Sequence, residues 1–186
     1  KPAPQDPPPQ AKPKSVMTLI ADYSYNRVYA VNEKGKIVLE LNDIFGAWDA
    51  EMTPNDTVLV TEFSVSRVNE LNRNGISVWT YEDLKNPYDA DFLPNGNILI
   101  TDTFAGRVIE VKPDRKRRKG GKVVWSYNKD IRPFDADRLA DGNTLISDVL
   151  KDRVIEVNPA GKIVWQKTDL PNIHDADRLP NGNTLV

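Results

Sequence analysis

Pairs of acidic residues, two positions apart, recur four times in this 186-residue sequence. They are Asp49 and Glu51, Asp89 and Asp91, Asp135 and Asp137, and Asp175 and Asp177. Because successive side chains of a strand point to opposite faces, the two acids of a pair project to the same side. Arranged around an axis, the pairs would line one mouth of a channel with carboxylates, and clustered oxygen ligands are what calcium prefers.

A structural role is the interpretation that we prefer for these acids. The first acid of a pair can accept hydrogen bonds from backbone N–H groups of a neighbouring turn. It can also bind an arginine in a two-pronged geometry, and one arginine recurs in each repeat, at Arg27, Arg67, Arg107 and Arg153. A further acid ends each predicted second strand, at Asp22, Glu62, Asp102 and Asp148. The sequence has no calcium loop of the D-x-D-x-D-G type, so we predict no metal site and no cofactor, with calcium as the open alternative.

The residue before each acid pair is where the repeats differ. It is Trp48, Tyr88, Phe134 or His174. One interpretation is a packing position at which imidazole substitutes for an aromatic ring. The other is a set of side chains that face a channel and bind a ligand, with His174 as a possible nucleophile. Under this second interpretation the candidate residues also include Asp89, Asp135 and Asp175.

A basic segment interrupts the third repeat at residues 112–122. It holds seven Lys or Arg residues and one Asp, whereas the whole chain has a net charge of -2, so the remainder carries about eight negative charges. The cluster at its centre could bind an acidic partner, a polyanion or an anionic lipid surface; its residues are Arg115, Lys116, Arg117, Arg118 and Lys119. The alternative is a solvated surface insertion. No aromatic residue lies within the segment, so we predict no specific nucleic-acid binding.

The elements that position these residues are short strands in a repeat of about forty residues. The first acids of the four pairs are 40, 46 and 40 residues apart, and the repeated arginines show the same spacings with the same six-residue excess. Each repeat contains four β-rich runs separated by Gly-containing turns, which is the size and pattern of a propeller blade. We therefore predict an all-β protein, a β-propeller of about four four-stranded antiparallel blades. Trp79, Trp125 and Trp165 on the fourth strands are expected to pack between blades.

The predicted boundaries follow from this repeat. Residues 1–15 contain six Pro and are expected to form a linker or tail. The propeller occupies residues 16–186, with blade units at 16–47, 48–87, 88–133 and 134–173 and a partial unit at 174–186. Three alternatives remain for the ends: a piece of a longer propeller, which we favour, a partial ring completed by a second copy, or a four-bladed ring in which residues 174–179 pair beside residues 17–22.

Two segments resemble a known family. The sequences HDADRLPNGNTLV at 174–186 and RVIEVNPAGKIVW at 153–165 resemble repeats of the arylsulfotransferase-like β-propeller family, and more loosely those of NHL and PQQ-type propellers. In that family a histidine in the central channel carries the sulfuryl group during its transfer between phenols. The resemblance implies this role for His174, the only histidine of the chain.

Our leading functional interpretation is a non-catalytic propeller module that binds or scaffolds a protein partner. The alternatives are an arylsulfotransferase-like enzyme, or a fragment of one, and a subunit that self-associates through open blade edges. We expect an extracellular, cell-surface or periplasmic location, although the chain shows neither a signal peptide nor a transmembrane segment. The absence of Cys excludes disulfides, zinc thiolate sites and thiol catalysis.

Overall fold

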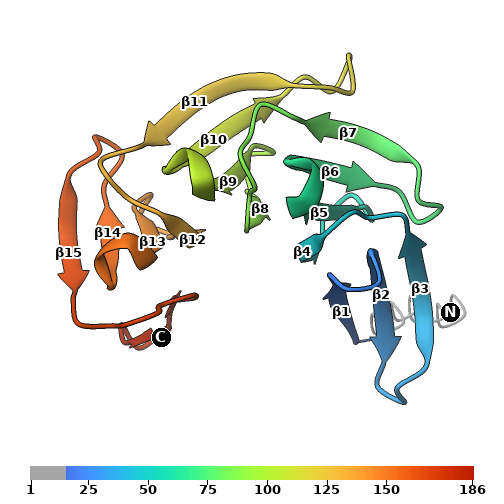
Figure 1. Cartoon of the computed structure of the whole chain (residues 1–186), viewed down its shortest axis with the longest axis horizontal. Helices are drawn as coiled ribbons and strands as arrows, with labels where there is room; N and C mark the ends of the chain where they lie inside the picture. The colour runs from blue at the N-terminus through green and yellow to red at the C-terminus, as the bar shows by residue number, and fades with distance from the viewer. Residues whose placement is uncertain (1–15) are drawn as a thin grey trace, which may run out of the picture.

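Antiparallel β-sheets arranged side by side in an open arc make up the protein (Figure 1). The computed structural model describes residues 16–186, so the Pro-rich segment 1–15 lies outside the described residues. Three four-stranded sheets stand between a three-stranded sheet at the start and a two-stranded sheet at the end of the described chain. The predicted all-β propeller architecture is confirmed. Within residues 16–186, no helix has the length and apolar character needed to cross a membrane.

Each sheet contains strands that are consecutive in the sequence. The first sheet consists of β1 (Met17–Asp22), β2 (Arg27–Asn32) and β3 (Ile37–Asn42). The second consists of β4 (Ala47–Met52), β5 (Val58–Glu62), β6 (Arg67–Leu71) and β7 (Ser77–Tyr81). The third consists of β8 (Ala90–Phe92), β9 (Ile98–Asp102), β10 (Arg107–Pro113) and β11 (Gly121–Tyr127).

The fourth and fifth sheets continue the same order. The fourth consists of β12 (Pro133–Arg138), β13 (Thr144–Asp148), β14 (Arg153–Val157) and β15 (Ile163–Lys167), and the fifth of β16 (Asp177–Arg178) and β17 (Thr184–Leu185). Short 3-10 helices join the second and third strands of three sheets: η1 (Phe63–Val65), η2 (Thr103–Ala105) and η3 (Val149–Lys151).

The second strands β5, β9 and β13 are buried along their whole length. Their apolar side chains alternate between the two faces, so that Val58 and Val60 pack toward the first sheet while Leu59 packs toward the third. Each sheet therefore shares a hydrophobic core with both neighbours, which explains why these strands are apolar on both faces.

The hairpin between the first and second strands is a turn followed by a glycine with positive φ. Gly96 donates its N–H to the Leu93 carbonyl at 2.8 Å and has a φ of 81°, while Asn95 keeps a negative φ. This is a longer turn than the two-residue type I′ that an Asn-Gly pair often forms. In the second sheet Asp56 occupies the glycine position with a φ of 61°, a conformation that Asp tolerates better than most residues.

The repeated arginines bind the acids that end the second strands. Arg67 makes two hydrogen bonds of 2.8 Å to the fully buried Glu62, and Arg107 and Arg153 bind the equally buried Asp102 and Asp148 at 2.7 and 2.9 Å. Arg27 binds Asp22 in the same way at 3.0 Å. The alternative in which these arginines pair with the first-strand acids is thus wrong. The reason is register, because each arginine lies directly opposite the second-strand acid across the short 3-10 or turn connection.

A tryptophan on the outer strand packs against the following sheet, as predicted. The Trp79 indole N–H donates to the Gly120 carbonyl at 2.8 Å, and that of Trp125 donates to the Pro159 carbonyl at 3.0 Å. Arg138 lies over Trp125 at 4.8 Å and pairs with Glu110 at 2.9 Å. Arg178 repeats this contact, lying 4.9 Å over Trp165 and 2.8 Å from Glu156. A guanidinium therefore clamps each of these sheets to the one before it.

The third sheet uses a different arginine for the same clamp. Phe92 occupies the position of Arg138 and Arg178, so its strand offers no guanidinium to the buried Glu70 of the second sheet. Arg115, from the basic segment, instead pairs with Glu70 and lies over Trp79 and Phe92 at 5.6 and 5.8 Å. An insertion thus supplies the cation that this repeat lacks.

The ends of the arc do not meet by strand pairing. β1 pairs with β2, and Asp177–Arg178 pairs with β17, so residues 174–179 do not complete the first sheet. The four-bladed ring, one of the three alternatives for the ends, is not what the structure shows. Self-association through blade edges stays a prediction.

Removal of the Arg115 guanidinium should destabilise the protein. Arg115→Ala leaves the Glu70 carboxylate, whose side chain is 2% exposed, without its cation, and we expect the free energy of unfolding in urea to fall by about 2 kcal/mol. Arg118→Ala is the control, because among residues 16–186 its side chain has no ion pair.

A second-site substitution separates this clamp from other effects of the segment. Phe92→Arg in the Arg115→Ala background places a guanidinium where Arg138 and Arg178 have theirs, so it should recover most of the lost stability. An Arg115→Ala variant as stable as the parent, or a double variant without recovery, would contradict the assignment.

Candidate functional site

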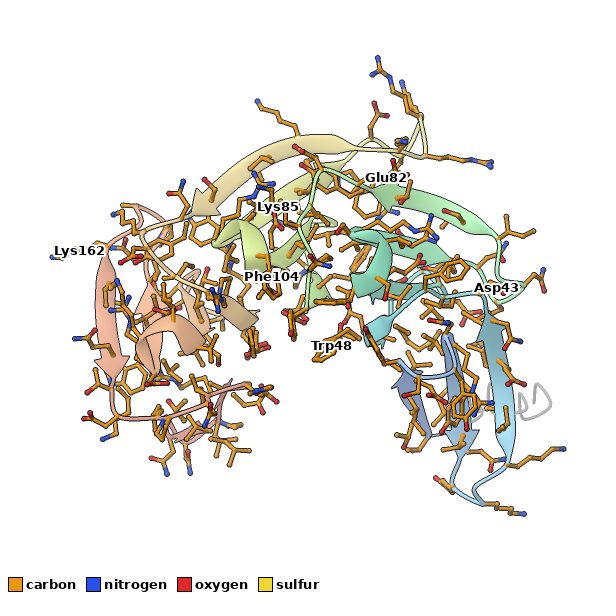
Figure 2. All side chains as sticks on the ribbon, viewed as in Figure 1. Asp43, Trp48, Glu82, Lys85, Phe104 and Lys162 are labelled. Carbon is orange, nitrogen blue, oxygen red and sulfur yellow. The ribbon has the colours of Figure 1, made fainter. Side chains whose placement is uncertain are left out.

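The candidate site is the concave side of the arc, formed by the first strands of the sheets. Strands β4, β8 and β12 lie on this inner side, whereas β3, β7, β11 and β15 form the outer side (Figure 1). Trp48 and Phe104 point into the hollow of the arc (Figure 2). We call this surface the inner edge.

The residues that precede the acid pairs form one continuous row of ring contacts along the inner edge. The ring centroids are 4.4 Å apart for Trp48 and Tyr88, 4.4 Å for Tyr88 and Phe134, and 4.7 Å for Phe134 and His174. Tyr88 and Phe134 are nearly parallel, with 8° between their planes. Tyr23 extends the row at the other end, 5.6 Å from Trp48. We call these five residues the aromatic row.

Two further aromatic residues come from the 3-10 helices and were not among the predicted site residues. Phe63 contacts Trp48 at 5.6 Å and Tyr88 at 5.4 Å, and Phe104 contacts Tyr88 at 6.4 Å. Both follow closely after a second-strand acid, as Tyr23 does, and this recurrence was the sequence signal that could have revealed them. Trp48 is 41% exposed and Phe104 53%, so the aromatic surface is open to solvent.

The first acid of each pair connects consecutive sheets through the backbone. Asp89 accepts a hydrogen bond from the Ala136 N–H, and Asp135 accepts one from the Ala176 N–H, both at 3.3 Å. Asp49 accepts the corresponding bond from Ala90. Each of these alanines lies between the two acids of the next pair. The same hydrogen bond therefore recurs from one repeat to the next. The predicted donor, a neighbouring turn, is wrong, because the N–H groups come from the first strand of the next sheet.

The acid pairs have no cationic partner in the described part of the chain. Within residues 16–186, none of these eight side chains forms an ion pair. Glu51 accepts a hydrogen bond from the Phe92 N–H, whereas none from the described residues reaches the carboxylate of Asp91 or Asp137. The inner edge therefore combines aromatic rings with carboxylates that lack a cation.

Burial and mutual repulsion raise the pKa values of these carboxyl groups. Burial, with repulsion from Glu51 and Asp137, raises the pKa of Asp91 to about 8. Burial and the charges of Asp137 and Asp175 raise that of Asp135 to about 8. The same two causes raise the pKa of Asp49 to about 6, that of Asp137 to about 6 and that of Asp89 well above its usual range. Carboxylates of consecutive sheets are therefore close enough to repel one another.

The acid pairs do not form a metal site in the described part of the chain. Across residues 16–186, no group of three or more His, Asp or Glu side chains is arranged to hold a metal ion. Calcium binding stays a prediction.

His174 ends the aromatic row and borders an open hollow of about 400 Å³. It packs edge-on against Phe134, and the hollow is lined by Leu170, Ile173 and Asp175 among others. No Lys or Arg lines this hollow in the described chain, although transfer of a sulfuryl group would call for cations or other donors toward its oxygens. The role of His174 as a sulfuryl acceptor stays a prediction.

The basic segment folds as a hairpin against the second sheet, and we call residues 112–122 the basic hairpin. The Gly120 N–H donates to the Thr80 carbonyl at 2.8 Å, and the Thr80 N–H donates to the Arg118 carbonyl at 3.2 Å. Arg115 pairs with Glu70, Arg117 with Asp114 and Lys119 with Glu82, so three of the five predicted partner-binding residues already bind carboxylates of their own chain. Lys116, Arg117 and Arg118 remain exposed.

Comparisons with known proteins support the fold and leave the function open. No protein-family model and no curated protein matches the sequence. Among solved structures, a protein of unknown function from Bacteroides caccae superposes with a TM-score of 0.72 at 19% identity, covering 92% of this chain and 64% of that chain. Virginiamycin B lyase from Staphylococcus aureus superposes with a TM-score of 0.62 at 20% identity, covering 81% and 51%.

A third similar structure is the Kuenenia stuttgartiensis hydrazine synthase, with a TM-score of 0.70 at 16% identity. It is matched over 89% of this chain and 50% of that chain. The chain thus spans less than two thirds of the length of these three proteins. At such identities the likeness shows the propeller fold, and the arylsulfotransferase-like resemblance stays a prediction.

The raised pKa values predict that the protein is less stable in mildly alkaline than in mildly acidic solution. Between about pH 4, where unfolded carboxyl groups titrate, and about pH 8, the folded chain holds more protons than the unfolded chain. The free energy of unfolding should therefore fall as the pH rises through this range.

The substitution Asp91→Asn tests the origin of this effect, because it removes one titrating group and keeps the shape. We expect urea titrations at about pH 5 and about pH 8.5 to show a smaller loss of stability in this variant, by about 1 kcal/mol. The exposed Asp43→Asn serves as the control and should keep the parent's pH dependence. An unchanged pH dependence in Asp91→Asn would refute the assignment.

Proposed function

We propose that this chain is a non-catalytic β-propeller binding module that holds a cationic ligand against its inner edge. The observation that supports the proposal most directly is the aromatic row, which runs unbroken from Tyr23 to His174 on the concave side of the arc. Each ring comes from a different sheet, so the surface is a product of the repeat architecture.

Exposure distinguishes Tyr23 and Trp48 of the row, and Phe104 beside it, from core residues, while Tyr88 and Phe134 are half-buried. The cores between sheets contain second-strand side chains such as Val58, Ile98 and Ile146, which are fully buried. In contrast, Trp48, Tyr23 and Phe104 are 41%, 45% and 53% exposed while contacting neighbouring rings. Contiguous exposed aromatic surface in a concave face is typical of a binding site.

The acidic groups next to the rings support a cationic ligand, most strongly at a pH at which they are ionised. The acid pairs immediately follow the row residues in sequence, and none has a cation partner within residues 16–186. Cations are attracted both by carboxylates and by the faces of Trp, Tyr and Phe. The chain itself provides an example at this edge, since the Arg132 guanidinium lies 5.6 Å over the Phe104 ring.

The length of the row supports an extended ligand. Its rings are distributed over four sheets and the start of a fifth, so a small cation would cover only one or two of them. A basic peptide segment can place successive Arg or Lys side chains on successive rings. We therefore take such a peptide as the ligand class, consistent with a module that binds a protein partner.

A labelled peptide of four arginines tests the proposal by fluorescence anisotropy. Trp48→Ala should weaken its binding about fivefold or more, because it removes the most central exposed ring. Tyr25→Ala is the matched control: Tyr25 is 76% exposed but outside the row, so its loss should leave the affinity unchanged.

The charge of the peptide gives the second arm of this experiment. A peptide of four glutamates should not bind the inner edge, and binding of the arginine peptide should strengthen as the pH rises and Asp91 loses its proton. Two results would contradict the proposal. One is equal affinity of the parent and Trp48→Ala for the arginine peptide. The other is binding of the glutamate peptide as tight as that of the arginine peptide and weakened to the same extent by Trp48→Ala.

A further inference from the structure

We propose that the basic hairpin is a docking site for an acidic peptide segment of a partner protein. The hairpin lies on the outer side of the arc, next to β7 (Figure 1), whereas Trp48 of the aromatic row points into the hollow (Figure 2). The two surfaces are thus on opposite sides of the molecule, and this inference does not depend on the function proposed for the inner edge.

The hairpin is anchored before any partner binds. Its ends are joined by the Asp114 N–H, which donates to the Gly120 carbonyl at 3.0 Å, and its tip is tied to Thr80 by the two backbone bonds described above. Arg115 and Lys119 hold it further through Glu70 and Glu82. An anchored site loses less conformational entropy on binding than a free loop of the same composition.

The cations that remain are available to a partner. Within residues 16–186, Lys112, Lys116, Arg118 and Lys122 form no ion pair, and Arg117 keeps its side chain 84% exposed at 3.5 Å from Asp114. Of these side chains, Lys112, Lys116, Arg117 and Lys122 border an open hollow of about 550 Å³ together with Pro113 and Gly121. A concentration of unpaired positive charge around a hollow attracts an anion with several charges.

The chemistry of the hairpin favours carboxylates over other anions. Three of its cations already bind carboxylates in the structure, those of Glu70, Glu82 and Asp114. It has no aromatic side chain on which a nucleic-acid base could stack and no large apolar side chain at its tip to enter a membrane.

The size of the partner is limited by the charge elsewhere on the chain. The remainder of the chain carries about eight negative charges, so a broad anionic surface such as a bilayer would also face repulsion. A narrow acidic peptide can contact the hairpin without approaching the negatively charged remainder of the chain. We therefore assign the site to an acidic segment rather than to a membrane or a duplex.

The experiment measures binding of a labelled peptide of six glutamates by anisotropy at about 50 mM and about 150 mM salt. The variant Lys116→Ala/Arg118→Ala/Lys122→Ala keeps Arg115 and Lys119, and therefore the anchoring. It should weaken binding at least tenfold and reduce its salt dependence.

The matched control is Lys34→Ala/Lys36→Ala/Lys162→Ala, which removes the same charge from exposed lysines outside the hairpin. It should bind almost as tightly as the parent, and unchanged urea unfolding of both variants shows that the fold is intact. Equal weakening in both triple variants would mean that net charge, not the hairpin, binds the peptide, and would overturn the proposal.

Competing occupants give distinct results that would also overturn it. Duplex DNA and vesicles containing phosphatidylserine are measured at the same salt concentration. If either binds the parent more tightly than the glutamate peptide does, and binds the hairpin variant weakly, the hairpin is assigned to that partner instead. Light scattering tests a second copy as the occupant. A mass above one chain's 20.9 kDa for the parent, together with a monomer mass for the hairpin variant, would assign the hairpin to self-association.

Discussion

The ion pair between a second-strand acid and the arginine at the start of the third strand is the interaction on which the arrangement of the sheets depends. Glu62, Asp102 and Asp148 are fully buried, and a buried carboxylate is tolerated only when it is paired and hydrogen-bonded. Beyond the arginine, each accepts a backbone N–H from the connection between sheets: Glu62 from Phe45, Asp102 from Lys85 and Asp148 from Arg132. Each pair therefore fixes the segment that leads into the first strand of its own sheet, β4, β8 or β12.

The inner edge is a consequence of those fixed first strands. Because the strands repeat at a constant offset, the residues before the acid pairs approach within ring contact, and the acids approach within repelling distance. Backbone bonds from Ala90, Ala136 and Ala176 partly offset the repulsion. The same regularity thus produces an aromatic surface beside a cluster of acidic groups, and their raised pKa values show that their ionised forms repel one another.

The third repeat shows how an insertion takes over a structural role and acquires a new surface. In the fourth and fifth sheets the clamp to the preceding sheet is an arginine on the first strand, but Phe92 occupies that position in the third, and Arg115 reaches the equivalent buried glutamate, Glu70, from the basic hairpin. Two hairpin cations, Arg115 and Lys119, anchor the hairpin to the second sheet, and this holds the unpaired ones on the outer side of the arc. The molecule consequently has its unpaired hairpin cations on the side opposite to the acid pairs.

The sequence by itself determined the blade pattern, since strand periodicity and Gly turns are local properties and the 40-residue spacing repeats them. It also identified Trp48, Tyr88, Phe134 and His174 as equivalent positions. Only the tertiary structure decided which acid each arginine binds, because that depends on register across the 3-10 connections. The same holds for Phe63 and Phe104 beside the aromatic row and for Arg115 on Glu70. Such contacts join residues of different elements. Their distances depend on the angle between sheets and on the paths of the loops, and the spacing of residues within one strand determines neither.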